Sequence, residues 1–319
     1  MTLTSPLKQT WLSGSETGRL MQYQATPVIR ATLLSWTVIL ATLYICAQRP
    51  SAWMWGFGLV LIGIEQNALS VLLHEAAHGF IHPNRLVNDG IAASLYGAPI
   101  LLQLGVYRDR HWQHHRALGT VDDTKRYPRS SIRGYRFLRH VFLSLTGVLA
   151  VRMAWTYARR LRTDREAHRV VNLVLVVFVQ AGVLAVCWAM GNLWMYPILW
   201  ILPIFTVMTL LVSIRSMAEH QPRDLPENLS DDEDISEISR TVHGNIVSRL
   251  IFAQFNFNYH HEHHLFPQIP FWNLPELHRL LKSKGYYDAH PEWLVSGYSN
   301  VFRALVDRTP DFENMASPT

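Results

Sequence analysis

Three clusters of histidines stand out among the 16 histidines of the sequence. They are HEAAH at residues 74–78, HWQHH at 111–115 and HHEHH at 260–264. On a helix, residues three or four positions apart lie on one face, so each cluster can direct two or three imidazoles at one place. Imidazole is a common ligand of zinc, copper and iron. The clusters therefore predict that this protein binds metal.

The first cluster alone also matches the H-E-x-x-H motif, in which two histidines bind zinc and the glutamate is the general base of a metalloprotease. This interpretation makes Glu75 the base and needs a carboxylate as a further ligand, for which Asp89 is the nearby candidate. It leaves the other two clusters without a role. We keep an intramembrane zinc metalloprotease as an alternative; otherwise Glu75 is a partner that orients a metal-bound imidazole.

The composition is that of a membrane protein. Hydrophobic residues make up 49% of the 319 residues and charged residues only 17%, against roughly 25% charged in ordinary soluble proteins. The net charge of +5 comes from arginines that flank apolar blocks, with no basic fold motif around them, so we expect no nucleic-acid partner. Cys46 and Cys187 both lie inside apolar blocks and offer no redox or iron–sulfur motif.

Apolar segments predict an all-α integral membrane fold with four transmembrane helices in two hairpins. A span needs about 20 apolar residues. The predicted spans are residues 31–48, 53–73, 170–190 and 194–214, and Gly191-Asn192 forms the turn in the uncharged run 170–214. Two weaker apolar stretches, 91–107 and 137–158, contain breaks or charges and suit interfacial or re-entrant helices.

Charge placement predicts the topology. Lys and Arg outnumber Asp and Glu between residues 79 and 169, and short basic loops stay in the cytoplasm. We therefore expect a cytoplasmic histidine-rich cap and cytoplasmic termini, in what we take to be a bacterial inner membrane. The expected divisions are a cytoplasmic N-terminal segment (1–30), without an export signal, one membrane domain (31–300) and a tail (301–319). The acidic run 231–234 is expected to be a solvated loop.

This topology brings all three histidine clusters to one membrane face, where His220, just after the last span, can join them. A catalytic zinc takes three protein ligands and a water, so nine imidazoles suit two metal ions. The nine candidate ligands are His74, His78, His111, His114, His115, His220, His260, His263 and His264. Metal transport or a purely structural metal site is another alternative, although the run 170–214 has no ionisable acidic or basic residue to support transport.

The order H-x-x-x-H, H-x-x-H-H, H-x-x-H-H, with Leu265-Phe266-Pro267 after the third cluster, resembles the integral-membrane fatty acid desaturase superfamily. That superfamily also contains carotenoid hydroxylases and ketolases. The resemblance extends over roughly residues 59–281 and implies four transmembrane helices and two non-haem iron ions held by the histidines. It implies His260, His263 and His264 as ligands, with His261 variable; a register that uses His261 and His264 stays open.

The resemblance also implies that His220 matches an additional histidine ligand after the fourth span. Some desaturases have an asparagine four residues before it, where this chain has Ser216, so a water-mediated iron contact there is in doubt. Glu75 and Glu262 are the candidate partners of the ligating imidazoles. No catalytic residue is expected beyond the metal ligands.

The resemblance implies an oxygen-dependent oxidoreductase that attacks an unactivated C–H bond. Introduction of a double bond into a fatty acyl or similar lipid chain is the first expectation, and hydroxylation or ketolation of a carotenoid or other lipid is the alternative. A few relatives act on small polar molecules. No flavin fingerprint, iron–sulfur cysteines or fused cytochrome motif is visible, so we expect an external electron donor of the ferredoxin or rubredoxin type with its reductase.

Overall fold

The computed structural model describes residues 11–118, 122–124, 133–163, 168–220, 239–288 and 291–307. These residues are mostly helical, as the sequence predicts. The acidic run 231–234 lies outside them, as do the first ten residues and most of the predicted C-terminal tail.

Among the described residues, four helical segments are long and apolar enough to cross a membrane, and up to six if each of two bent helix pairs is one span. Each of the four predicted spans thus overlaps a candidate membrane-spanning helix. The four segments are Gly14–Gln48, Ala52–His78, Asn172–Ala189 and Tyr196–His220. The helices that form them are α2 (Gly14–Leu20), α3 (Ala25–Gln48), α4 (Ala52–His78), α9 (His168–Ala189), the π-helices η3 (Tyr196–Ile201) and η4 (Ile204–Met208), and α10 (Thr209–His220).

Helix α4 is longer than the predicted span 53–73, because the HEAAH segment continues the helix through His78. The helix ends at Gly79, whose φ of 86° is in the left-handed region that glycine adopts without steric cost. The backbone N–H groups of Gly79 and Phe80 donate to the carbonyls of Ala76 and Glu75. The first histidine cluster therefore lies in the last turns of a span.

Two further helix pairs are sharply bent. The pair Arg85–Ile100 and Leu104–Arg116 bends by 92°, and the pair Tyr135–Leu145 and Val148–Thr156 bends by 79°. The first pair contains α5 (Arg85–Ile91), η1 (Ala92–Gly97), η2 (Ala98–Ile100) and α6 (Leu104–Arg116). The second contains α7 (Tyr135–Leu145) and the first part of α8 (Val148–Thr163). The breaks fall within or beside the two stretches that we expected to be interfacial or re-entrant.

The chain divides into two compact units. The apolar unit comprises Ala25–Arg108 and Leu138–Ile214. The polar unit comprises Met1–Gln24, Asp109–Phe137 and Arg215–Thr319.

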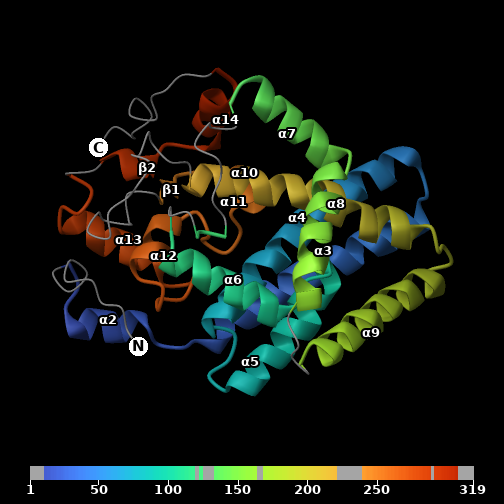
Figure 1. Ribbon diagram of the computed structural model, residues 1–319, viewed down its shortest axis with the longest axis horizontal. Helices are drawn as coiled ribbons and strands as arrows, with labels where there is room; N and C mark the ends of the chain where they lie inside the picture. The colour runs from blue at the N-terminus through green and yellow to red at the C-terminus, as the bar shows by residue number, and fades with distance from the viewer. Residues whose placement is uncertain are drawn as a thin grey trace. The chain divides into compact units, whose positions relative to one another are not determined.

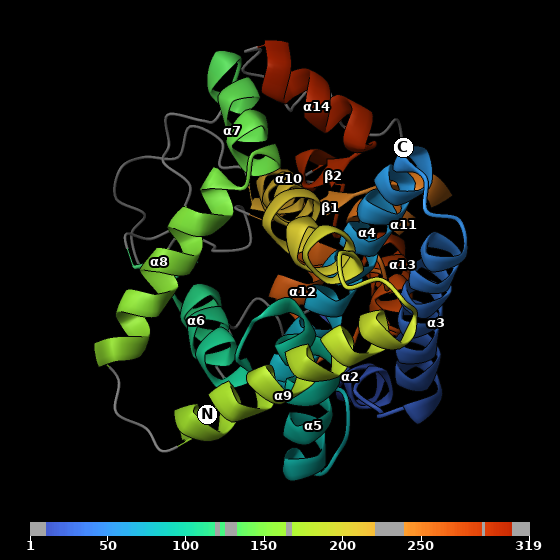
Figure 2. The same ribbon diagram turned by 90° about the vertical axis from the view of Figure 1, so that its right-hand side faces the viewer.

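Within the apolar unit, α3 and α4 pack side by side (Figure 1, Figure 2). Gln180 of α9 satisfies its buried amide in full: its Nε2 donates to the carbonyls of Ala98 and Pro99 at 2.8 and 3.1 Å. Its Oε1 accepts from the Tyr196 hydroxyl at 3.0 Å and from the Trp200 indole at 3.1 Å. A buried polar group is tolerated when it is hydrogen-bonded, so Gln180 links three elements of this unit.

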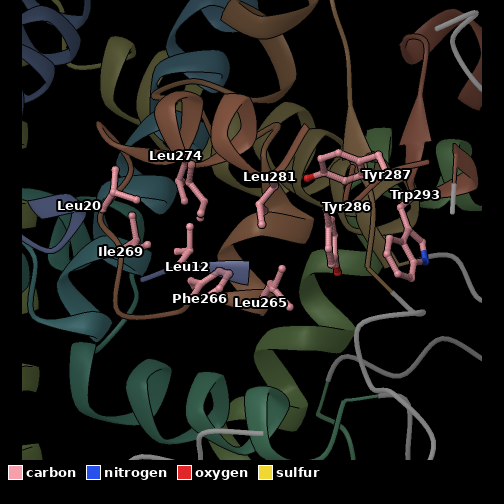
Figure 3. Packing of buried hydrophobic residues seen from close by; sticks show 11 residues of the cluster. Leu12, Leu20, Leu265, Phe266, Ile269, Leu274, Leu281, Tyr286, Tyr287 and Trp293 are labelled. Carbon is pink, nitrogen blue, oxygen red and sulfur yellow. The ribbon is translucent and has the colours of Figure 1, made fainter. Parts of the chain in front are cut away.

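The polar unit is built around short helices and one small parallel sheet. Its elements after α10 are β1 (Thr241–Val242), α11 (Ile246–Phe252), α12 (His260–Leu265), α13 (Leu274–Ser283), η6 (Pro291–Trp293), β2 (Leu294–Val295) and α14 (Tyr298–Asp307). Thr241 pairs with Leu294 and Val242 with Val295 in the parallel ladder. Figure 3 shows a hydrophobic cluster in which Leu265 and Phe266, at the end of α12, pack with Leu274 and Leu281 of α13. This core supports the short helix that carries the third histidine cluster.

Close helix packing in the apolar unit makes Gly63 sensitive to substitution. A Cβ at Gly63 would lie 2.5 Å from Val207 Cβ, whereas a Cβ at Gly56 of the same helix would meet nothing within 4 Å. We expect Gly63→Ala to destabilise the protein by about 1–3 kcal/mol through overpacking. We expect Gly56→Ala to be neutral or slightly stabilising, because alanine favours helix. Melting curves of the two variants in detergent test this; equal melting temperatures would contradict the close packing.

Candidate metal centre

Four imidazoles of the polar unit converge on one place. This tetrad consists of His114 on α6, His220 at the end of α10, and His260 and His264 on α12. All four side chains are buried, and one nitrogen from each lies within 4.8 Å of the others. A helix of only six residues presents two of the four, because His260 and His264 are one turn apart.

The nitrogen separations in the tetrad suit a metal ion. His220 Nε2 lies 3.3 Å from His114 Nε2 and 2.7 Å from His260 Nε2, and His264 Nε2 lies 3.1 Å from His260 Nε2. Metal–imidazole bonds of about 2.0–2.1 Å place neighbouring ligand nitrogens about 2.9 Å apart at a right angle and about 3.4 Å apart at the tetrahedral angle. The chemistry and spacing of this donor set therefore fit a transition metal.

Carboxylates lie near the Nδ1 atoms of two of these imidazole rings. Asp123 Oδ1 is 2.7 Å from His114 Nδ1, and the Asp123 side chain is only 4% exposed. A carboxylate at Nδ1 fixes the tautomer and leaves Nε2 as the ligand atom. Glu219 Oε2 is 3.8 Å from His260 Nδ1 and 3.9 Å from Arg215 Nε, which makes it a longer-range partner of the same site.

The electrostatics of the tetrad favour a neutral His264 ring. Burial lowers the pKa of His264 well below its usual value, and the four neighbouring imidazoles His115, His260, His220 and His114 lower it further. An imidazole must be neutral to ligate a metal. His264 is therefore in its ligating form at neutral pH.

A second set in the polar unit, the histidine trio, consists of His111, His115 and His263. His115 Nε2 is 2.9 Å from His111 Nε2 and 3.1 Å from His263 Nε2. Their ligand nitrogens also lie within 4.8 Å of one another. Helices α6 and α12 thus each contribute to both the tetrad and the trio.

In the apolar unit, His74 and His78 form a pair on the last turns of α4. Their ring centroids are 5.0 Å apart, and their ligand nitrogens are within 4.8 Å of each other. His74 Nδ1 is 2.9 Å from Glu75 Oε1, and both side chains are buried. Glu75 thus occupies the position of an orienting partner of His74, the role expected of it outside the protease interpretation.

The opposite face of α12 makes different contacts. His261 Nδ1 is 3.1 Å from the carbonyl oxygen of Ser239, and its Nε2 is 3.0 Å from the Tyr286 hydroxyl. Its ring also stacks on Trp293 with centroids 4.7 Å apart. His261 is absent from both polar-unit histidine groups among the described residues, so the geometry favours the register with His260, His263 and His264.

Glu262, predicted to orient a ligating imidazole, binds a separate set of residues. Its carboxylate accepts hydrogen bonds from Thr241 of β1, from His278 Nδ1 of α13 and, at 2.5 Å, from the Tyr287 hydroxyl. Burial acts to raise the pKa of Glu262, but the hydrogen bond and charge of His278, with smaller contributions from His261 and Thr241, outweigh it, so the pKa is lowered. Glu262 is a buried anion that ties α12 to β1 and α13.

The negative charge of Glu262 also affects its neighbour. Burial and then the Glu262 carboxylate raise the pKa of Tyr287 well above its usual value. The phenol therefore stays protonated and donates to Glu262 at any ordinary pH.

Sequence reasoning missed Asp123 and Glu219. Glu219 directly precedes His220, and an acidic residue beside a candidate ligand is a weak signal that the sequence offers. Asp123 follows the second cluster by eight residues in non-helical chain, where no periodicity relates it to His114.

Apolar helices of spanning length and histidine-only donor sets define the class of helical membrane proteins with candidate metal sites. The sequence profile of the fatty acid desaturase family matches residues 50–296. The chain belongs to this family and is an integral membrane oxidoreductase. Members of the family are generally di-iron enzymes that act on lipids.

Individual relatives are distant. The chain is 27% identical over 272 residues to dihydrorhizobitoxine desaturase of Bradyrhizobium elkanii, covering 80% of this chain and 76% of that one. It is 28% identical to beta-carotene ketolase of Paracoccus sp. (strain PC1), covering 77% and 88%. It is 25% identical to the chloroplastic omega-6 fatty acid desaturase of Brassica napus, covering 83% of this chain but only 62% of the plant enzyme.

Asp123 offers a direct test of the tetrad. We expect Asp123→Asn to weaken metal binding at the tetrad by about 10–100-fold, because loss of an orienting carboxylate typically costs that much affinity. Titration of the metal-free protein with Co²⁺, followed by visible absorption, measures the change. Asp122→Asn, at an exposed neighbouring position, is the matched control. Equal affinities in the two variants would show that Asp123 does not support the site.

Glu262 offers a test of how α12 is anchored. We expect Glu262→Ala to destabilise the protein by about 3 kcal/mol or more, because it removes the shared acceptor of three buried donors. Tyr287→Phe removes one of those hydrogen bonds and is expected to cost about 1 kcal/mol. Thermal unfolding of both variants shows which one loses more stability. A loss in Tyr287→Phe as large as that in Glu262→Ala would contradict the role of Glu262 as a shared acceptor.

Proposed function

We propose that this protein is a di-iron, oxygen-dependent enzyme that introduces a double bond into a fatty acyl or similar lipid chain. The observation that carries the proposal is the convergence of imidazole nitrogens at about 3 Å separations in two groups of the polar unit. Family membership selects iron over zinc or copper, since imidazole alone suits all three.

The proposed ligands are the nine histidines predicted from the sequence. The tetrad would hold one iron and the trio would contribute to a second; His74 and His78 are proposed as iron ligands from the family pattern and from their own pairing on α4. Bound iron would supply dioxygen activation and the removal of hydrogen from an unactivated C–H bond.

The chain's own residues prepare this chemistry. Burial keeps water from the tetrad and keeps His264 neutral. Asp123 and Glu75 hold the rings of His114 and His74 in one tautomer. No acid or base beyond these groups is assigned to the reaction.

The membrane topology, the domain bounds and the electron donor are also part of the proposal. We propose two helical hairpins, interfacial or re-entrant helices at the bent pairs and a cytoplasmic histidine-rich cap with cytoplasmic termini, in a bacterial inner membrane. The proposed domain is residues 31–300, between an N-terminal segment 1–30 and a tail 301–319. An external donor of the ferredoxin or rubredoxin type would supply electrons.

Hydroxylation or ketolation of a carotenoid is the second candidate, and the similarity to a beta-carotene ketolase over 77% of this chain favours it. The similarity to dihydrorhizobitoxine desaturase adds a compound related to dihydrorhizobitoxine as a further candidate substrate. The zinc-protease alternative is disfavoured, because the Asp89 carboxylate that it would use as a ligand is paired with Arg108.

The reaction is tested by expressing the chain in a host of known lipid and pigment content and profiling the products by mass. We expect a product that has lost two hydrogens from an acyl chain. A product that has gained an oxygen would favour the second candidate, and the same change in a small polar metabolite would redirect the substrate class. We expect His263→Ala to lose both product and iron, with His82→Ala as the control; retention of both in His263→Ala would contradict the proposed site.

A further inference from the structure

The last turn of α4 is held by a polar clamp in the apolar unit. Arg108 of α6 donates from Nη2 to the carbonyl of Ala76 at 3.0 Å and from Nε to the carbonyl of Ala77 at 3.2 Å. Asn88 of α5 donates from Nδ2 to the same Ala76 carbonyl at 3.0 Å. The Ala76 carbonyl also accepts the backbone N–H of Gly79 at 3.1 Å. The two side chains therefore add further donors to the carbonyls at the end of α4, where the regular hydrogen bonds of the helix stop.

The guanidinium is itself fixed by a carboxylate. Arg108 Nη1 donates to Asp89 Oδ2 at 2.9 Å, and Nη2 donates to Asp89 Oδ1. The Arg108 side chain is only 11% exposed. The planar guanidinium therefore donates to the α4 carbonyls and to the Asp89 carboxylate at the same time. The single ammonium group of lysine cannot reproduce this geometry.

The clamped carbonyls lie between two proposed iron ligands. Ala76 and Ala77 separate His74 from His78, and His78 is the last residue of α4. The ends of helices open more readily than their middles, and loss of the last turn would carry the His78 imidazole away. Metal ligands must be held to within about 0.5 Å of their productive positions.

We propose that Arg108, fixed by Asp89, is a positioning residue that holds His74 and His78 in their metal-ligating arrangement by fixing the last turn of α4. The inference rests on the proposed function, because it takes this histidine pair as iron ligands. Arg108 also lies three residues before His111 on α6, so the clamp belongs to the helix that carries the second histidine cluster.

The test compares R108K with R85K in the full-length protein, purified in detergent without metal. Arg85 is the matched control, because it also reaches Asp89, at 3.6 Å, but is 74% exposed and has no bond to the α4 carbonyls in the described contacts. Iron affinity and iron per chain are measured by Fe²⁺ titration with elemental analysis. Melting temperatures are measured with and without iron, and H74A marks the result of losing a ligand.

We expect R108K to bind the His74-dependent iron at least about tenfold more weakly than the unmodified protein, approaching H74A. We expect the added iron to raise its melting temperature less than it does for R85K, since stabilisation by a ligand follows its affinity. Unchanged iron affinity in R108K overturns the proposal. This holds even if the melting temperature of R108K falls by the same amount with and without iron, because Arg108 then stabilises the fold without positioning the histidines.

D89N decides the question if R108K does not accumulate, because it removes the charge that fixes the guanidinium and leaves Arg108 in place. Weakened iron binding in D89N supports the proposal, and iron binding equal to that of R85K overturns it. The two hypotheses fail in different ways. If the proposed function is wrong, the unmodified protein binds no iron. If only the role of Arg108 is wrong, the unmodified protein and R108K bind iron equally well.

Discussion

The constraint on which the polar unit depends is the close approach of imidazole nitrogens in largely buried surroundings. Lone pairs that face one another at about 3 Å repel unless a proton or a cation lies between them, and burial disfavours extra protons on the rings. A metal ion satisfies several such lone pairs at once. The unit is organised to hold this arrangement: α6, α10 and α12 bring the tetrad together, and the buried carboxylates Asp123 and Glu219 lie on the Nδ1 side of two of its rings.

Helix α12 shows how much structure a short ligand-bearing helix requires. Six residues cannot form a stable helix in isolation. Its residues in the two histidine groups are His260, His263 and His264. Glu262 binds β1 and α13, and Leu265 enters the core shown in Figure 3. The anchoring contacts keep the helix at one rotation, so that its histidines contribute to both polar-unit groups.

Much of this organisation could be predicted from the sequence, because apolar runs and residue spacing are local patterns that can be recognised without the tertiary fold. Long apolar runs predicted four spans that overlap the four candidate membrane-spanning helices of the described residues. The resemblance to the desaturase superfamily, together with helical spacing, favoured His260, His263 and His264 as the ligands of the third cluster and left a register with His261 open. In the structure those three belong to the two histidine groups of the polar unit, and His261 contacts Tyr286 instead. The length of α4 was underestimated, since hydropathy falls where the polar HEAAH segment begins although the helix continues.

The supporting polar contacts could not be predicted, because they join residues that no local pattern relates. Asp123 reaches His114 from non-helical chain, and Arg108 reaches back more than thirty positions to the carbonyls of α4. Glu262 was noticed because it lies between ligands, but its hydrogen bonds go to Thr241, His278 and Tyr287, which only the tertiary fold brings to it. Sequence therefore indicates the donors, and the fold identifies what orients them.

Anomalous X-ray scattering from crystals of the purified protein, recorded at the iron and zinc absorption edges, tests the central claim most directly. The account predicts two iron peaks per chain, one of them within about 2.1 Å of a ring nitrogen from each of His114, His220, His260 and His264. A single peak that appears at the zinc edge and not at the iron edge would contradict it.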